Sequence, residues 1–169
     1  MISNSEVLDT SFRSAIDRMI NLSRIEAFTS PIDTNLAAAG VMKKRDGGPA
    51  LLFTSVDGYA IPIIGNLLCC QANCEAAFGV DFHGIRNAIG RALSAPIPPV
   101  LVGKSSAQQH VHTDKIDLSR MLPVLFHTAK DAGRFITAGV VIVPIQKPRS
   151  TTLRIIDCNS SGLIGPRSS

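Results

Sequence analysis

Hydrophobic residues near the start of the chain recur at helical spacing. Apolar positions three to four residues apart follow Thr10 and Ser11, either of which can cap a helix, and continue to about Ser23. Charged residues fall between them, on the opposite face. The pattern predicts an amphipathic helix, followed by a short extended piece over residues 25–31.

A second helix and a hairpin are expected next. Asp33 precedes a predicted helix over residues 34–44, whose basic end suits the negative end of a helix dipole. Two apolar runs follow, over 50–56 and 60–68, with Asp57-Gly58 between them. Because both of these residues tolerate positive φ, the sequence predicts two strands joined by a type I′ turn.

The middle of the chain indicates two more helices and then loops. The first helix is expected over 71–79, and the second over 82–94, with Asp81 as its cap and Pro96 beyond its end. Three short extended pieces are expected after the prolines, at residues 100–102, 108–112 and 116–118.

Near the C-terminal end, Val140-Val-Ile-Val143 indicates a buried strand, which we predict over 135–144 with a partner strand over 151–157. Ahead of this strand, Asp131-Ala-Gly133 predicts a turn whose carboxylate can bond local amides. Helices that alternate with hairpins favour an α+β fold over a regular βαβ series. We expect a small mixed-sheet domain over residues 1–98, a second segment over 99–158, and a mobile tail over 159–169.

Composition limits the possible functions. The chain has 169 residues, of which 45% are hydrophobic and 18% charged, an ordinary globular balance. Its net charge of +4 is scattered, and one Tyr with no Trp offers little surface for stacking bases, so nucleic-acid binding is not expected. No apolar run reaches the roughly 18 residues that span a membrane, and the charged start is unlike a signal peptide. A cytoplasmic protein with free thiols is expected.

Two local clusters have alternative interpretations. Cys69, Cys70 and Cys74 do not have the spacing of a zinc ribbon or a thioredoxin motif, so core thiols are favoured over a metal or redox site. His110 and His112 would share one face of a strand, and Asp114 and Asp117 lie nearby as possible further metal ligands. Surface histidines are the favoured interpretation.

Four motifs, in order along the chain, resemble a known family. They are Ser11-Phe-Arg-Ser14, Gly47-Gly-Pro-Ala-Leu-Leu-Phe53, Leu122-Pro123 and Asp131-Ala-Gly-Arg-Phe-Ile-Thr-Ala-Gly139. This order resembles the UbiD family of prenylated-flavin-dependent carboxy-lyases, over about residues 8–145. The resemblance implies that the segment over 99–158 forms the first strands of a flavin-binding split β-barrel.

The resemblance also implies a chemistry and a site. Family members remove carbon dioxide from aromatic or α,β-unsaturated carboxylic acids with prenylated FMN, a divalent metal (Mn or Mg) and K. Thr137, Ala138 and Gly139 match the family's Thr-x-Gly, where small residues let the cofactor approach the backbone. Thr151 and Arg154 match the Ser and Arg of the family's Asn-x-Ser-Ile-x-Arg.

The sequence departs from the family at the metal site. Arg149 occupies the Asn position, and a guanidinium has no lone pair with which to bind a metal. No Asp or Glu occurs between Asp131 and Asp157, and the family's later carboxylates have no counterpart here. We therefore expect a truncated and inactive carboxy-lyase that forms a homo-oligomer or joins a complementary C-terminal chain. The alternative is a non-catalytic accessory subunit or pseudo-enzyme that keeps the fold.

Overall fold

The structure is a computed structural model that describes residues 8–98, 100–114, 116–136, 140–144, 151–155 and 158–159. Its contacts divide the chain into two compact units. Unit 1 consists of Met1–Phe28, Arg45–Leu52 and Ile64–Ile116, and unit 2 consists of Thr29–Lys44, Phe53–Ile63 and Asp117–Ser169. The described chain is mixed α/β, in agreement with the predicted class, and the domain boundary near residue 98 stays a prediction.

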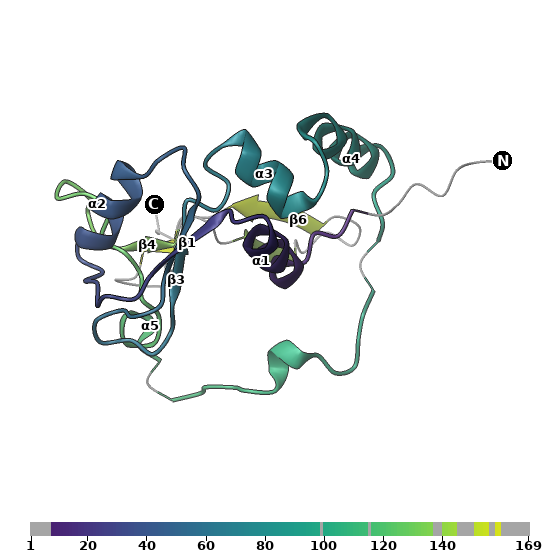
Figure 1. Cartoon of the computed structure of the whole chain (residues 1–169). Helices are drawn as coiled ribbons and strands as arrows, with labels where there is room; N and C mark the ends of the chain where they lie inside the picture. Colours follow the sequence, from purple (N-terminus) through teal and green to yellow (C-terminus); the bar gives the residue numbers. More distant parts are fainter. Residues whose placement is uncertain are drawn as a thin grey trace. The chain divides into compact units, whose positions relative to one another are not determined.

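Unit 1 contains three helices and most of a small three-stranded sheet. The helices are α1 (Phe12–Asn21), α3 (Gln71–Phe78) and α4 (Phe82–Ser94), and α3 contacts both of the others (Figure 1). All three were predicted. The sheet has the order β1-β2-β3, with bounds Ile25–Phe28, Ala50–Phe53 and Ile63–Gly65. Its core is a buried cluster of Met19, Ala50, Ala76 and Ala77.

The two predicted helix caps differ in the structure. The Asp81 side chain accepts a hydrogen bond from the Gly84 N–H at 2.7 Å and caps α4 as predicted. Ser11 is the N-cap residue of α1, but its side chain makes no cap bond. Instead, the Ser11 N–H donates to Asp9 Oδ1 at 2.8 Å. The prediction is thus right about Ser11 as the N-cap residue and wrong about a capping bond from its side chain.

The first helix of unit 2 is α2 (Ala37–Lys44), which starts later than predicted. The Asn35 N–H donates to Asp33 Oδ1 at 2.8 Å, and Leu36 has a φ of +66°. A residue in the left-handed region interrupts a helix, so residues 34–36 form a turn ahead of it. One further short helix, α5, spans Leu118–Met121.

The Asp57-Gly58 turn is present, but its type differs from the prediction. Val56 and Tyr59 form an isolated antiparallel bridge around it, and the Tyr59 N–H donates to the Val56 carbonyl at 3.1 Å. Gly58 has a φ of +80°, and Asp57 is not among the residues with positive φ. A type I′ turn requires positive φ at both residues, so that assignment is wrong, whereas a type II turn requires it only at the second.

The strands around the turn are also shorter than the runs predicted over 50–56 and 60–68. β2 ends at Phe53, and β3 begins at Ile63. Val56 pairs instead with Ile32, and the Asp57 N–H donates to the Ile32 carbonyl at 3.0 Å. Backbone groups beyond Phe53 therefore bond to another segment of unit 2.

The C-terminal strands pair as antiparallel ribbons. β5 (Val140–Pro144) pairs with β6 (Thr151–Ile155), which confirms the predicted partner strand. β4 (Phe135–Ile136) pairs with β7 (Cys158–Asn159). The predicted strand over 135–144 is thus described in two pieces. Residues 160–169 of the expected tail lie outside the described residues.

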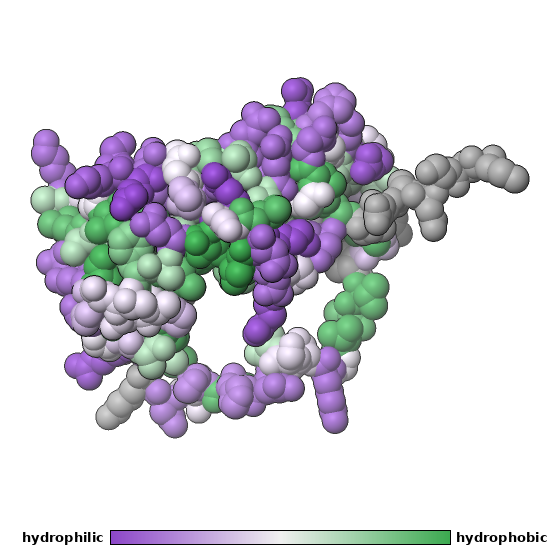
Figure 2. All heavy atoms as spheres, in the orientation of Figure 1, coloured by the Kyte–Doolittle hydropathy of each residue, from purple (hydrophilic) through white to green (hydrophobic). Residues whose placement is uncertain are grey.

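The segment over residues 95–117 is exposed and contains no described strand. Its one regular element is the single turn η1 (Ser106–Gln108), so the extended pieces predicted at 100–102, 108–112 and 116–118 are wrong as strands. Its first part is hydrophobic and its later part mostly hydrophilic (Figure 2). Within the described part of the chain, no helix is both long enough and apolar enough to cross a membrane.

Candidate functional site

A short turn leads into the predicted cofactor segment. The Thr128 N–H and Oγ1 each donate to the Asp131 carboxylate at 3.0 Å, and the Asp131 N–H donates back to the Thr128 carbonyl at 3.1 Å. This confirms the prediction that the Asp-Ala-Gly sequence forms a turn whose carboxylate bonds local groups. Asp131 is therefore used for local structure.

Arg134, three residues after Asp131, makes hydrogen bonds to a distant part of unit 2. Its Nη1 donates to Thr34 Oγ1 at 3.1 Å, to the Thr34 carbonyl at 3.4 Å and to the Val124 carbonyl. Thr34 and Val124 are buried, with 4% and 8% of their surface exposed. All of these acceptors are neutral oxygens. The guanidinium therefore forms no ion pair here and links the segment that contains Arg134 to the segments that contain Thr34 and Val124.

Backbone pairing reinforces the same junction. The Phe126 N–H donates to the Thr34 carbonyl at 3.0 Å, and the Leu36 N–H donates to the Phe126 carbonyl at 3.0 Å. Asn35 and Phe126 form a parallel bridge. The chain before β4 is thus held at Val124 and Phe126, just after the Leu122-Pro123 motif, and this arrangement positions the start of β4 at Phe135.

The structure places only part of the site predicted from the family resemblance. Thr137, Ala138 and Gly139 lie outside the described residues, between β4 and β5. Thr151 and Arg154 lie on β6, where their backbones pair with Pro144 and Val141. The two matched motifs are therefore attached to neighbouring paired strands. A cofactor-binding role for these residues stays a prediction.

The alternative metal cluster is not assembled. In the described residues, no group of three His, Cys, Asp or Glu side chains could hold a metal ion. His110 and His112 are exposed in a loop. Asp117 caps α5 by accepting from the Ser119 N–H at 3.0 Å. The Ser119 hydroxyl, also bonded to this carboxylate, lowers the pKa of Asp117 below its ordinary value.

The described residues do not provide a ligand set for the divalent metal that family members use with the flavin. Among the residues matched to the flavin site, Thr137, Ala138 and Gly139 lie outside the described residues, and Thr151 and Arg154 are placed by the backbone pairing of β6. Unit 2 therefore positions the paired strands β5 and β6, which carry or adjoin in sequence the residues matched to the flavin site.

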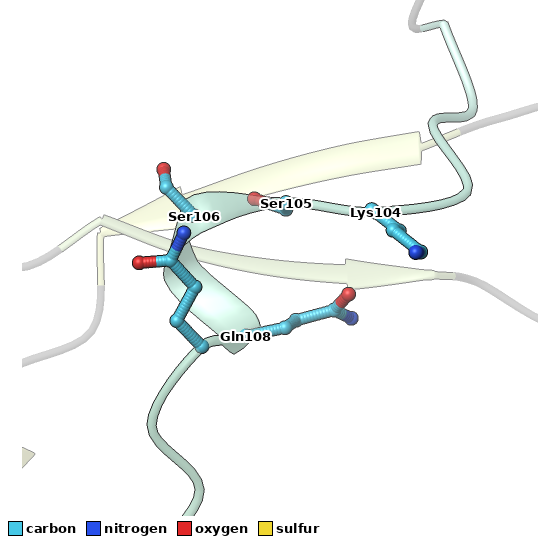
Figure 3. Close-up of a pocket in the computed structure, with 5 residues that line it drawn as sticks. Lys104, Ser105, Ser106 and Gln108 are labelled. Atoms are coloured by element: carbon cyan, nitrogen blue, oxygen red, sulfur yellow. The ribbon is translucent and has the colours of Figure 1, made fainter.

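A hollow in the exposed segment does not coincide with this site. Its volume is about 380 Å³, and it surrounds the turn η1 (Figure 3). Ligand sites are usually concave and mostly apolar, with a few polar groups that converge. The lining of this hollow is polar and exposed, so we assign no ligand to it. The lining residues are Lys104, Ser105, Ser106, Gln108 and Gln109.

Sequence reasoning missed the role of Arg134 and Thr34. Arg134 lies inside one of the motifs that carry the family resemblance, and that position was the available signal. Thr34 gave no signal, because its carbonyl and hydroxyl meet Arg134 across 100 residues of sequence. A contact of this range depends on the tertiary fold.

Two family models match the chain in succession. The N-terminal domain of 3-octaprenyl-4-hydroxybenzoate carboxy-lyase matches residues 16–93, and the Rift-related domain of the same enzyme matches residues 100–154. Gallate decarboxylase from Lactiplantibacillus plantarum is 27% identical over 111 residues, which are 62% of this chain and 23% of that protein. An uncharacterized protein from Aquifex aeolicus is 29% identical over 153 residues, 78% of this chain and 31% of that protein.

A solved structure extends this similarity to the fold. It is an evolved dimeric form of the UbiD-class enzyme HmfF from Pelotomaculum thermopropionicum in complex with prFMN. The TM-score is 0.82 at 28% identity, over 94% of this chain and 39% of that one. The chain therefore spans less than two fifths of the length of each of these relatives.

Proposed function

Because this chain belongs to the UbiD family, we propose that it supplies the N-terminal domain and the first flavin-binding strands of a carboxy-lyase. In this proposal the reaction is the non-oxidative decarboxylation of an aromatic or α,β-unsaturated carboxylic acid. The observation that carries the proposal is the match of both family models, in order, over most of the chain. The similarity to HmfF, a UbiD-class enzyme whose solved structure contains prFMN, supports the choice of cofactor.

The proposed cofactor site lies on the C-terminal strands of unit 2. Thr137, Ala138 and Gly139 would lie against the flavin, with Thr151 and Arg154 contributing from β6. Prenylated FMN, when bound, supplies the carbon chemistry of decarboxylation, and the protein contributes binding and orientation. The role proposed for Arg134 and Thr34 is to hold the chain before β4 so that the strand pair begins at a fixed place.

We also propose that a second polypeptide, or a second copy of this chain, completes the barrel. The described β5 and β6 form a two-stranded sheet, and β4 and β7 form another. Isolated two-stranded ribbons are marginally stable in water and leave edges that can pair with further strands. A split barrel that contains these strands requires more partners than the described residues provide.

The test measures flavin binding and carbon dioxide release separately. The chain is studied alone and together with the part of HmfF that this chain does not cover. We expect the mixture to bind prenylated FMN, with Arg154→Ala weakening that binding and the exposed Arg91→Ala leaving it unchanged. We expect no carbon dioxide from the chain alone. Failure of the mixture to bind flavin would contradict the proposed function, and binding without turnover would favour the accessory-subunit alternative.

A further inference from the structure

Two adjacent cysteines in unit 1 face the same backbone oxygen. Cys69 Sγ lies 3.6 Å from the Gly48 carbonyl oxygen, and Cys70 Sγ lies 3.9 Å from it. Both are free thiols and both are only partly buried. Two thiols that share one acceptor lie close together. Because they are partly exposed, a small molecule can reach them.

Each of the two sulfur atoms has a polar side chain next to it. Arg24 Nη2 lies 3.4 Å from Cys70 Sγ, and Asn73 Nδ2 lies 3.5 Å from Cys69 Sγ. Cys70 is also the N-cap residue of α3. A guanidinium and a helix N-terminus are the surroundings in which cysteine sulfur becomes a nucleophile. Cys74 differs, because its Sγ lies near the Leu68 carbonyl at 3.8 Å.

We propose that Cys69 and Cys70 form a thiol-modification site that low-molecular-weight disulfides oxidise reversibly to a vicinal disulfide. Cys70 reacts first, because Arg24 supplies an N–H donor to the sulfur that carries negative charge during attack. Burial raises the pKa of the Cys69 thiol, so Cys69 stays protonated at the first step and reacts second.

The exchange balances in two steps. The Cys70 thiol loses its proton and attacks one sulfur of the small disulfide, whose S–S bond breaks and whose other half leaves as a thiol. Cys69 then loses its proton and attacks Cys70 Sγ in the mixed disulfide, which releases the second small thiol. Two protein thiols are oxidised, one small disulfide is reduced, and both protons leave on the released thiols.

The geometry of adjacent residues makes such a bond reversible. Neighbouring Cα atoms are about 3.8 Å apart, which is shorter than the roughly 4.4–6.8 Å usual in disulfides. The resulting strain makes the bond easier to reduce, and strained or exposed disulfides are typically regulatory. Oxidation also removes both S–H donors from the Gly48 carbonyl, which keeps its bond from Asn73 Nδ2 at 3.1 Å.

The test follows the three thiols by mass spectrometry. Folded chain is incubated with oxidised glutathione, remaining thiols are alkylated, and the tryptic peptide over residues 46–86 is analysed. This peptide contains Cys69, Cys70 and Cys74, whereas Cys158 lies in a different peptide. We expect glutathione on Cys70 at early times, and later a peptide that has lost two hydrogens and carries alkylated Cys74 alone.

Variants and a denatured control make the assignment specific. Cys74→Ser should oxidise as the wild type does, and Cys69→Ser should stop at glutathione bound to Cys70. The same order of modification in denaturant would overturn the proposal, because the preference must come from the folded surroundings of Cys70. Three alkylated thiols after oxidation of the wild type, or a bond to Cys74, would overturn it as well.

Discussion

In each of the two units, one polar side chain makes hydrogen bonds to segments far away in the sequence, but the type of side chain differs between the units. In unit 1, Asn73 has none of its surface exposed, and its Nδ2 donates to the carbonyls of Gly48 and Asn66 at 3.1 and 3.0 Å. Its Oδ1 accepts from Arg24 Nε at 3.0 Å. In unit 2, the half-buried Arg134 donates to the oxygens of Thr34 and Val124.

The difference lies in the chemistry of the two groups. An amide both donates and accepts, so Asn73 is satisfied while fully buried and without charge. A guanidinium only donates, so Arg134 hydrogen-bonds to several oxygen acceptors and keeps part of its surface in water. No buried side-chain nitrogen or oxygen in the described residues lacks a partner. We therefore expect removal of the Asn73 side chain to lower the free energy of unfolding more than removal of the Arg134 side chain.

The largest effect is expected for Asn73→Ala. The substitution leaves the Gly48 and Asn66 carbonyls without this donor and leaves Arg24 without its Oδ1 acceptor. Buried groups that lose a partner cost about 1–3 kcal/mol each, and partial relaxation should give a total of about 2–4 kcal/mol. Urea unfolding measures the change. Gln71→Ala, at an exposed position of the same helix, is the control and should stay within about 0.5 kcal/mol. Similar losses in both variants would contradict the role of Asn73.

Arg134→Met should cost less, about 1–3 kcal/mol. The Thr34 carbonyl keeps its bond from the Phe126 N–H, and Arg134 is only half-buried, so water can replace more of the lost bonds than around the fully buried Asn73. Arg134→Lys should recover part of the loss, because an ammonium can replace some of the donated bonds without the planar geometry. The exposed Lys130→Met is the matched control for removing a positive charge. If Arg134→Met destabilises the chain more than Asn73→Ala does, the ranking of the two units is reversed.

The helices of unit 1 could be predicted from the sequence because their information is local. Apolar spacing marked α1, and Asp81 marked the start of α4 three residues before the amide that it binds. The shift in the start of α2 could not be predicted in this way. It depends on Leu36 adopting a positive φ while its N–H bonds to Phe126, which is 90 positions away.

The candidate site shows the same limit. The motif around Asp131 predicted a turn, since Thr128 and Asp131 are close in sequence. The partners of Arg134 and Asn73 were not predicted, because most of them are backbone carbonyls, which any residue type provides. Asn73 lies in a short helix that also contains Gln71 and Glu75, and nothing in the sequence distinguishes it from them. Cys69 and Cys70 were interpreted as core thiols, whereas the structure leaves them partly exposed beside Arg24.

A third prediction tests whether the turn in unit 2 depends on backbone conformation rather than on packing. Gly58 has a φ of +80°, and a Cβ added there would meet nothing within 4 Å. Gly58→Val should therefore cost only the strain of positive φ, about 1–2 kcal/mol, and Gly58→Asn should cost less. Thermal melting compares them. Gly40→Ala is a control of opposite sign: its Cβ also meets nothing within 4 Å, but it lies in α2, where Ala is favoured by about 1 kcal/mol. Equal melting temperatures for the wild type and Gly58→Val would contradict the turn.

The smallest expected effect is the difference in stability between alanine variants of two N-cap residues in unit 1, Asp81 and Ser11. Asp81→Ala removes the acceptor of the Gly84 N–H and should cost about 1 kcal/mol, the usual value for a lost cap. Ser11→Ala should cost almost nothing, because the Ser11 side chain makes no cap bond and its own N–H is bonded to Asp9. Asp81→Asn should keep most of the stability, since an amide oxygen can accept the same bond. Both alanine variants are compared with the wild type by urea unfolding in one buffer. If Ser11→Ala destabilises as strongly as Asp81→Ala, residue type at the N-cap decides the stability, and the hydrogen bond seen at Asp81 does not.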